Sequence, residues 1–135
     1  MRFFGKDRRQ RALDEIAVVC ERAAAGDLGV RVVDTESHGE LAPILQSLNR
    51  LLDRTEAFIR EATASLTYAS EGKFFRTFML RGMLGEFRRG AQVINTARSS
   101  MQAKAEATAR LEAEMAEQRA EMEARARAER QQPAD

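Results

Sequence analysis

The stretches AAGDLGVRV (residues 24–32) and GELAPILQSLNRLLD (residues 39–53) decide the fold, because both recur in altered form further along the chain. The copies begin 46 residues later, which is the separation of Gly26 from Gly72. The alignment needs no gap. Self-similarity at a fixed period is the signature of a repeated structural unit. The chain therefore carries two copies of one module.

The repeat covers three kinds of position: glycines at turns, a Gly-Glu pair before a helix, and a hydrophobic-Asn pair within it. The matched pairs are Gly26 and Gly72, Leu28 and Phe74, Gly39 and Gly85, Glu40 and Glu86, Leu41 and Phe87, Leu48 and Ile94, Asn49 and Asn95. Upstream, the pairs are Leu13 and Ile59, Cys20 and Leu66, Ala23 and Ala69.

Each unit is predicted to be a helix, a connector and a second helix. Apolar residues at spacings of three and four predict an amphipathic helix from about 11 to 25, ended by Gly26. The alternation of Leu28, Val30 and Val32 with other residues predicts an extended connector with one apolar face. Leu28 and Val32 are expected to be buried, and Arg31 and Asp34 to be exposed. The second helix begins near Glu40.

One helix is expected to belong to both units. No Gly or Pro interrupts residues 44–71, and their apolar rhythm is unbroken, so a continuous helix leaves the first unit and opens the second. It ends at Gly72. A Phe- and Met-rich connector (73–84) follows, and a last helix runs from about Glu86 toward Arg130.

The tail of that last helix has a weak apolar seam. Met101, Met115 and Met122 share a heptad position that Thr108 interrupts, and favourable pairs such as Glu106–Arg110 lie four residues apart. A solvated helix in a marginal coiled coil is expected. The predicted organisation is a flexible basic tail (1–10), a first unit (11–56), a second, divergent unit (57–102), a coiled-coil helix (103–130) and a disordered end (131–135).

These strings resemble HAMP domains. Residues 24–32 are similar to the start of a HAMP connector, and residues 39–53 to the start of its second helix. The family's acidic-hydrophobic and Phe-Asn-x-Met patterns correspond here to Glu40, Leu41, Ile44, Leu48, Asn49 and Leu51. Gly39 stands where the family has a leading Asp. Residues 71–87 resemble the second HAMP-like unit of some cytoplasmic methyl-accepting chemotaxis proteins.

The resemblance implies an all-α fold: two concatenated parallel four-helix bundles, each made by two chains, followed by a coiled coil. It also implies that paired connector residues pack against each bundle and relay small rotations of the helices. The residues that carry this expectation are Gly26, Leu28, Val32, Glu40, Leu41 and Leu48 in the first unit, and Gly72, Phe74, Phe78, Glu86, Phe87 and Ile94 in the second.

Composition argues against several other classes. Charged residues make up 32% of the 135-residue chain, yet the formal net charge is only +1, which does not favour nucleic-acid binding. The single cysteine, Cys20, and the absence of a long apolar run favour a cytoplasmic protein without membrane contact. No catalytic motif, metal-ligand pair or cofactor loop is present, so neither an enzyme nor a cofactor is expected. Cys20 is interpreted as a core residue and His38 as a solvated or capping residue, not as ligands.

Three functional hypotheses remain open. The leading one is a homodimeric relay that transmits or tunes conformational signals beside chemoreceptors or sensor kinases. The second is a static dimerisation scaffold whose C-terminal helix recruits a partner. The third is a small-ligand sensor that uses the Phe- and Met-rich connector, although core packing is the simpler interpretation of those side chains.

Overall fold

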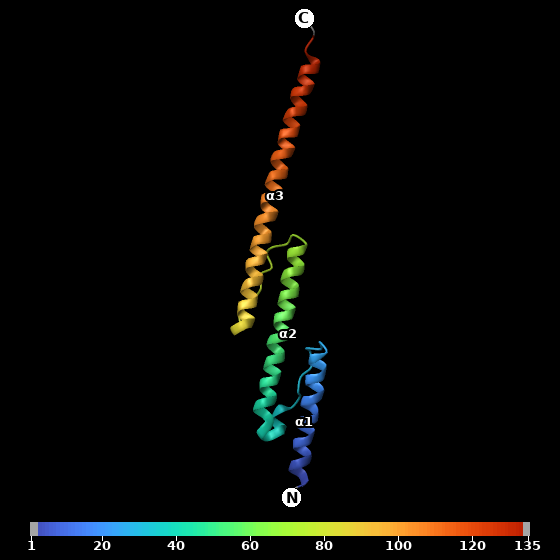
Figure 1. Cartoon of the computed structure of the whole chain (residues 1–135), viewed down its shortest axis with the longest axis vertical. Helices are drawn as coiled ribbons and strands as arrows, with labels where there is room; N and C mark the ends of the chain where they lie inside the picture. The colour runs from blue at the N-terminus through green and yellow to red at the C-terminus, as the bar shows by residue number, and fades with distance from the viewer. Residues whose placement is uncertain (1–2, 134–135) are drawn as a thin grey trace.

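Within residues 3–133, the part that the computed structural model describes, the only regular secondary structure is helical. The elements are α1 (Phe3–Ala24), a short 3-10 helix η1 (Thr35–Leu41), α2 (Ala42–Ser70) and α3 (Gly85–Gln131). Figure 1 shows α1, α2 and α3 running in the same direction, so each connector carries the chain back along its unit. The all-α prediction is confirmed.

No helix within the described residues is both long enough and apolar enough to cross a membrane.

Helix α2 confirms the prediction of one rod shared by the two units. Its first half packs against α1 and the first connector, and its second half packs against α3 (Figure 1). It begins at Ala42, two residues later than expected, because Gly39 has a φ of 58° and breaks the helical path inside η1. Pro43 then lies in the first turn, where its missing N–H costs no hydrogen bond.

The start of α1 differs from the prediction. Residues 3–10 belong to the helix and not to a flexible tail. Side-chain pairs one turn apart support this extension: Arg11 is ion-paired with Asp7, and Gln10 donates to Asp14 at 3.0 Å. The hydrogen bond from Arg11 holds the pKa of the Asp7 carboxyl below its usual range. Residues 1–2 of the predicted tail and residues 134–135 of the predicted disordered end (131–135) lie outside the described part, whereas Gln131 belongs to α3 and not to a disordered end.

The first unit has an aliphatic core. Its buried side chains come from α1, the connector and α2 in turn, and Leu45 is wholly enclosed. The core consists of Val19, Val30, Val32, Leu45 and Leu52, with Ile16, Ala23, Leu28, Leu41 and Leu48 packed around it.

The second unit has an aromatic core. Phe58 of α2 meets Phe78 of the connector with ring centroids 5.2 Å apart, and Phe87 of α3 at 5.9 Å. The core consists of Phe78, Met83 and Ala91, with Ala57, Phe58, Ala62, Leu80, Phe87 and Ile94 packed around it.

The second half of α3 extends beyond the rest of the chain (Figure 1). Nearly every side chain from 103 to 133 is exposed, including Leu111, Met115 and Met122. Nothing in the single chain packs against this segment, so the coiled-coil prediction for it stays a prediction.

Candidate functional site

Each connector is held to the second helix of its unit by one asparagine. Asn49 accepts a hydrogen bond from the N–H of Val32 and donates one to its carbonyl, both at 2.9 Å. Asn95 makes the same two bonds with Phe78, at 2.8 and 3.1 Å. The side-chain amide replaces the strand neighbour that an extended backbone otherwise needs. We call these two contacts the asparagine clamps.

The turn into each connector also repeats. Gly26 donates to the carbonyl of Ala23 at 3.0 Å, and Gly72 donates to that of Ala69 at 3.0 Å. Their φ angles are 100° and 76°, the left-handed region that favours glycine at a helix end. Because clamp and turn recur 46 residues apart, the copies share backbone geometry as well as sequence.

The structure brings most of the predicted relay residues into the two cores. Val32 and Phe78 are buried, whereas Leu28 and Phe74, the other expected connector contacts, are half-buried. Leu41, Leu48, Phe87 and Ile94 pack around the cores from the second helices. Glu40 and Glu86 lie outside them, both exposed; Glu40 is 3.8 Å from Arg9, and Glu86 is 3.0 Å from Arg89.

Arg31 contradicts the prediction that it is exposed. Its guanidinium reaches across the connector to Asp53 at 2.8 Å and Glu56 at 2.6 Å on α2. It also donates to the carbonyls of Leu28 and Val30. Burial opposes the charge, but the hydrogen bonds and charges of the two carboxylates outweigh it and hold the pKa of Arg31 above its ordinary value. Sequence reasoning placed Arg31 by alternation alone, which ignores how far its side chain reaches.

His38 also differs from the prediction of a solvated or capping residue. Its side chain is 8% exposed, and Nε2 lies 3.3 Å from the Glu15 carboxylate of α1. Cys20, expected in the core, is exposed within the single chain. Within the described residues, no group of His, Cys, Asp and Glu side chains is arranged to hold a metal ion.

The Arg31 contacts should contribute measurably to stability. We expect Arg31→Gln to lower the free energy of unfolding by about 1–2 kcal/mol, since it removes charge-assisted hydrogen bonds at a partly exposed site. High salt should shrink the difference because it screens such pairs. Urea unfolding at two salt concentrations measures both effects. Arg50→Gln on the exposed side of α2 is the control, and equal losses in the two variants would contradict the assignment.

A second apolar face is left open on the helices. Leu13 and Cys20 on α1, and Ile44 and Leu51 on α2, are exposed although they flank buried positions. The corresponding residues of the second unit are Ile59, Leu66, Gly90 and Ala97, of which Ile59 and Leu66 are large and about half exposed. Each pair is seven residues apart and so forms one stripe along its helix. We call this set the open stripe.

The geometry thus defines a chain of two repeated helical units joined by one continuous helix. Comparison with known proteins adds a relative. Over 86 residues, 64% of its length, the chain is 38% identical to the methyl-accepting chemotaxis protein Amb0994 of Paramagnetospirillum magneticum. The match spans 20% of that protein, so the chain corresponds to a small part of it. No known family profile and no solved structure matches the chain.

Proposed function

We propose that this chain forms a parallel homodimer in which each unit is a HAMP-like four-helix bundle. The observation that carries the dimer is the exposed area. A compact monomer of 15.2 kDa exposes roughly 7,100 Å², whereas this chain exposes 10656 Å². The excess is about 3,500 Å² per chain, or about 7,000 Å² for two copies, which is larger than the roughly 2,000–5,000 Å² that many permanent homodimers bury in total and so leaves enough surface for such an interface.

The open stripe is the surface that we assign to the partner copy. It occurs at equivalent positions of both units, and it includes half-exposed Leu51 and Ile59 on the shared helix. A parallel partner places identical stripes opposite each other along the whole of α2. The same arrangement gives the seam of 103–131 a neighbour in register.

We further propose that the dimer relays conformational signals in a chemotaxis or sensor-kinase pathway and has no catalytic role. The similarity to a methyl-accepting chemotaxis protein supports the pathway. The rigid helix common to both units supports the relay, because a change in the packing of one bundle must move the helix that the other bundle contains. A static scaffold would have the same dimer but only one packing.

The dimer has a direct test. We expect Leu51→Lys to weaken self-association on the order of 100-fold or more, since a buried ammonium without a partner costs several kcal/mol. Val33→Lys is the matched control, because Val33 is 77% exposed and lies on the connector, outside the open stripe. Light scattering over a concentration series measures both. A monomer mass for the wild type at micromolar concentration, with helical circular dichroism intact, rules the proposal out.

A further inference from the structure

The cores of the two units differ in polarity at equivalent positions. The first unit buries Val19, Leu52 and Val30. The residues 46 positions later are Ser65, Arg98 and Arg76. The second copy has therefore placed one buried serine and two partly exposed arginines at positions where the first copy is aliphatic. We call Ser65, Arg76 and Arg98 the polar layer.

The polar layer is only partly satisfied. Ser65 is fully buried, and its hydroxyl donates to the carbonyl of Arg76 at a long 3.3 Å. Arg98 donates to the carbonyl of Phe74 at 2.6 Å, and Arg76 is 3.0 Å from the Glu61 carboxylate. Among the described residues, the buried side-chain atoms without a hydrogen-bond partner are Nε of both arginines in the second unit and Nδ1 of His38 in the first. Buried donors without partners disfavour the packed state.

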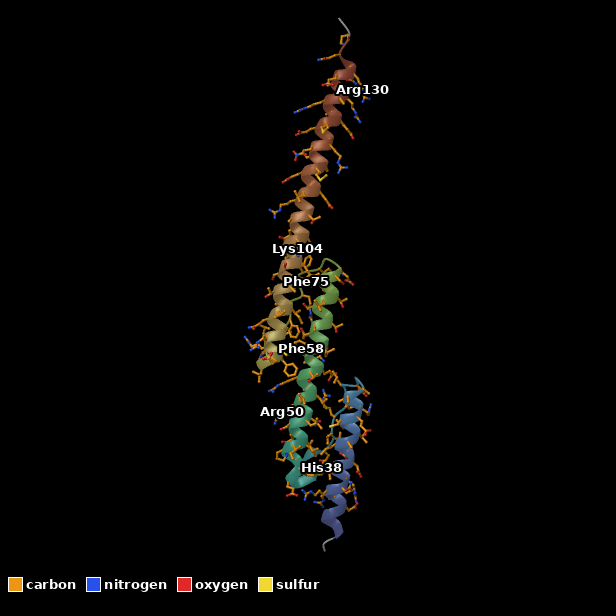
Figure 2. All side chains as sticks on the ribbon, viewed as in Figure 1. His38, Arg50, Phe58, Phe75, Lys104 and Arg130 are labelled. Atoms are coloured by element: carbon orange, nitrogen blue, oxygen red, sulfur yellow. The ribbon has the colours of Figure 1, made fainter. Side chains whose placement is uncertain are left out.

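The polar layer lies at the end of the second unit from which the tail of α3 leaves. The aromatic contacts of Phe58 with Phe78 and Phe87 occupy the other end. Figure 2 labels Phe58 midway along α2, and Phe75 and Lys104 near the end of α2, beside the outgoing part of α3. The unit thus has its aromatic core near its start and the polar layer beside its outgoing helix, where Tyr68 and Phe75 also meet with ring centroids 5.4 Å apart.

We propose that the polar layer makes the tail-side end of the second unit less stable than the first unit, so that this end opens or repacks while the first unit stays folded. Its effect is to let α3 change its packing against α2 next to the tail. A role for this end as the moving part of a relay rests on the proposed function. The difference in stability between the two units does not, because every contact involved lies within one chain.

Native-state hydrogen exchange on the full chain tests this proposal. We expect amides of residues 62–69 and 94–101 to have protection factors at least about tenfold lower than those of residues 16–23 and 48–55. The variant Ser65→Val/Arg98→Leu installs the side chains of the first unit and keeps the Arg76–Glu61 pair. It should raise protection in the second unit by about tenfold or more.

The mirror variant, Val19→Ser/Leu52→Arg, should lower protection in the first unit. Equal protection of the two units in the wild type would overturn the proposal, and so would a loss of protection in Ser65→Val/Arg98→Leu. Light scattering on the same samples measures the oligomeric state, so the proposed dimer and the proposed difference in protection are tested separately. A monomer that keeps the protection difference refutes the dimer alone, whereas a dimer with uniform protection refutes the labile layer alone.

Discussion

Replacing Asn49 by alanine should lower the free energy of unfolding by about 2–4 kcal/mol. The substitution removes both hydrogen bonds to the backbone of Val32, which is 4% exposed. The orphaned N–H and carbonyl then stay buried beside the first core, and each costs roughly 1–3 kcal/mol when no partner replaces the lost one. Urea unfolding at one fixed protomer concentration measures the change, since association would otherwise alter the apparent stability.

Two further variants make this result specific to the clamp. Asn95→Ala removes the equivalent bonds to Phe78 and should destabilise the second unit by a similar amount. Gln46→Ala, on the exposed side of α2, should change stability by less than about 0.5 kcal/mol. If Asn49→Ala lowers the free energy of unfolding no more than Gln46→Ala does, the asparagine clamps do not contribute to stability.

The sequence alone predicted the repeated elements because their signals are local. Gly26 and Gly72 fit a left-handed helix end, and the uninterrupted rhythm of residues 44–71 fits one long helix. These requirements act within a few residues of the chain. The alignment also paired Asn49 with Asn95, but it could not assign their role, because the partner backbone lies 17 residues away in sequence.

The details that sequence reasoning missed depend on contacts between elements. Alternation correctly placed Val32 inside but could not show that the long side chain of Arg31 folds back onto α2. The apolar rhythm of α1 likewise merges two faces: Val19 packs inside the chain while Leu13 and Cys20 stay exposed. The spacing of apolar residues indicates that both faces of the helix are apolar, but it does not indicate which neighbour covers each face.

Helix α2 presents different faces to the two units. Leu45 and Leu52 pack into the first core, whereas Phe58 and Ser65 face the second unit. Six residues separate Leu52 from Phe58, which turns the contact face by about 240° at roughly 100° per residue. The two units are therefore set at a fixed angle by the length of helix between them. A relay through α2 depends on that angle.

Insertions between the units test whether the angle matters. Two residues added after Thr55 turn everything downstream by about 200°, whereas seven turn it by only about 20°, because seven residues make nearly two turns. Both insertions separate Arg31 from Glu56, so the two variants lose this ion pair equally and the loss cannot account for a difference between them. Each unit keeps its own core in both cases. We expect only the two-residue insertion to misalign the stripes that we assign to the partner copy.

The readout is the coupling between units. In the chain without an insertion, Asn49→Ala in the first unit should speed hydrogen exchange in residues 58–69 and 91–98 of the second unit. The increase should be on the order of tenfold if the shared helix transmits about 1.4 kcal/mol. The seven-residue insertion should preserve this response, and the two-residue insertion should abolish it. Coupling that survives both insertions would mean that the stripes do not set the phase of the relay. Coupling lost equally in both would mean that the spacing of the units matters rather than their angle, which favours a static scaffold over a relay that turns on its shared helix.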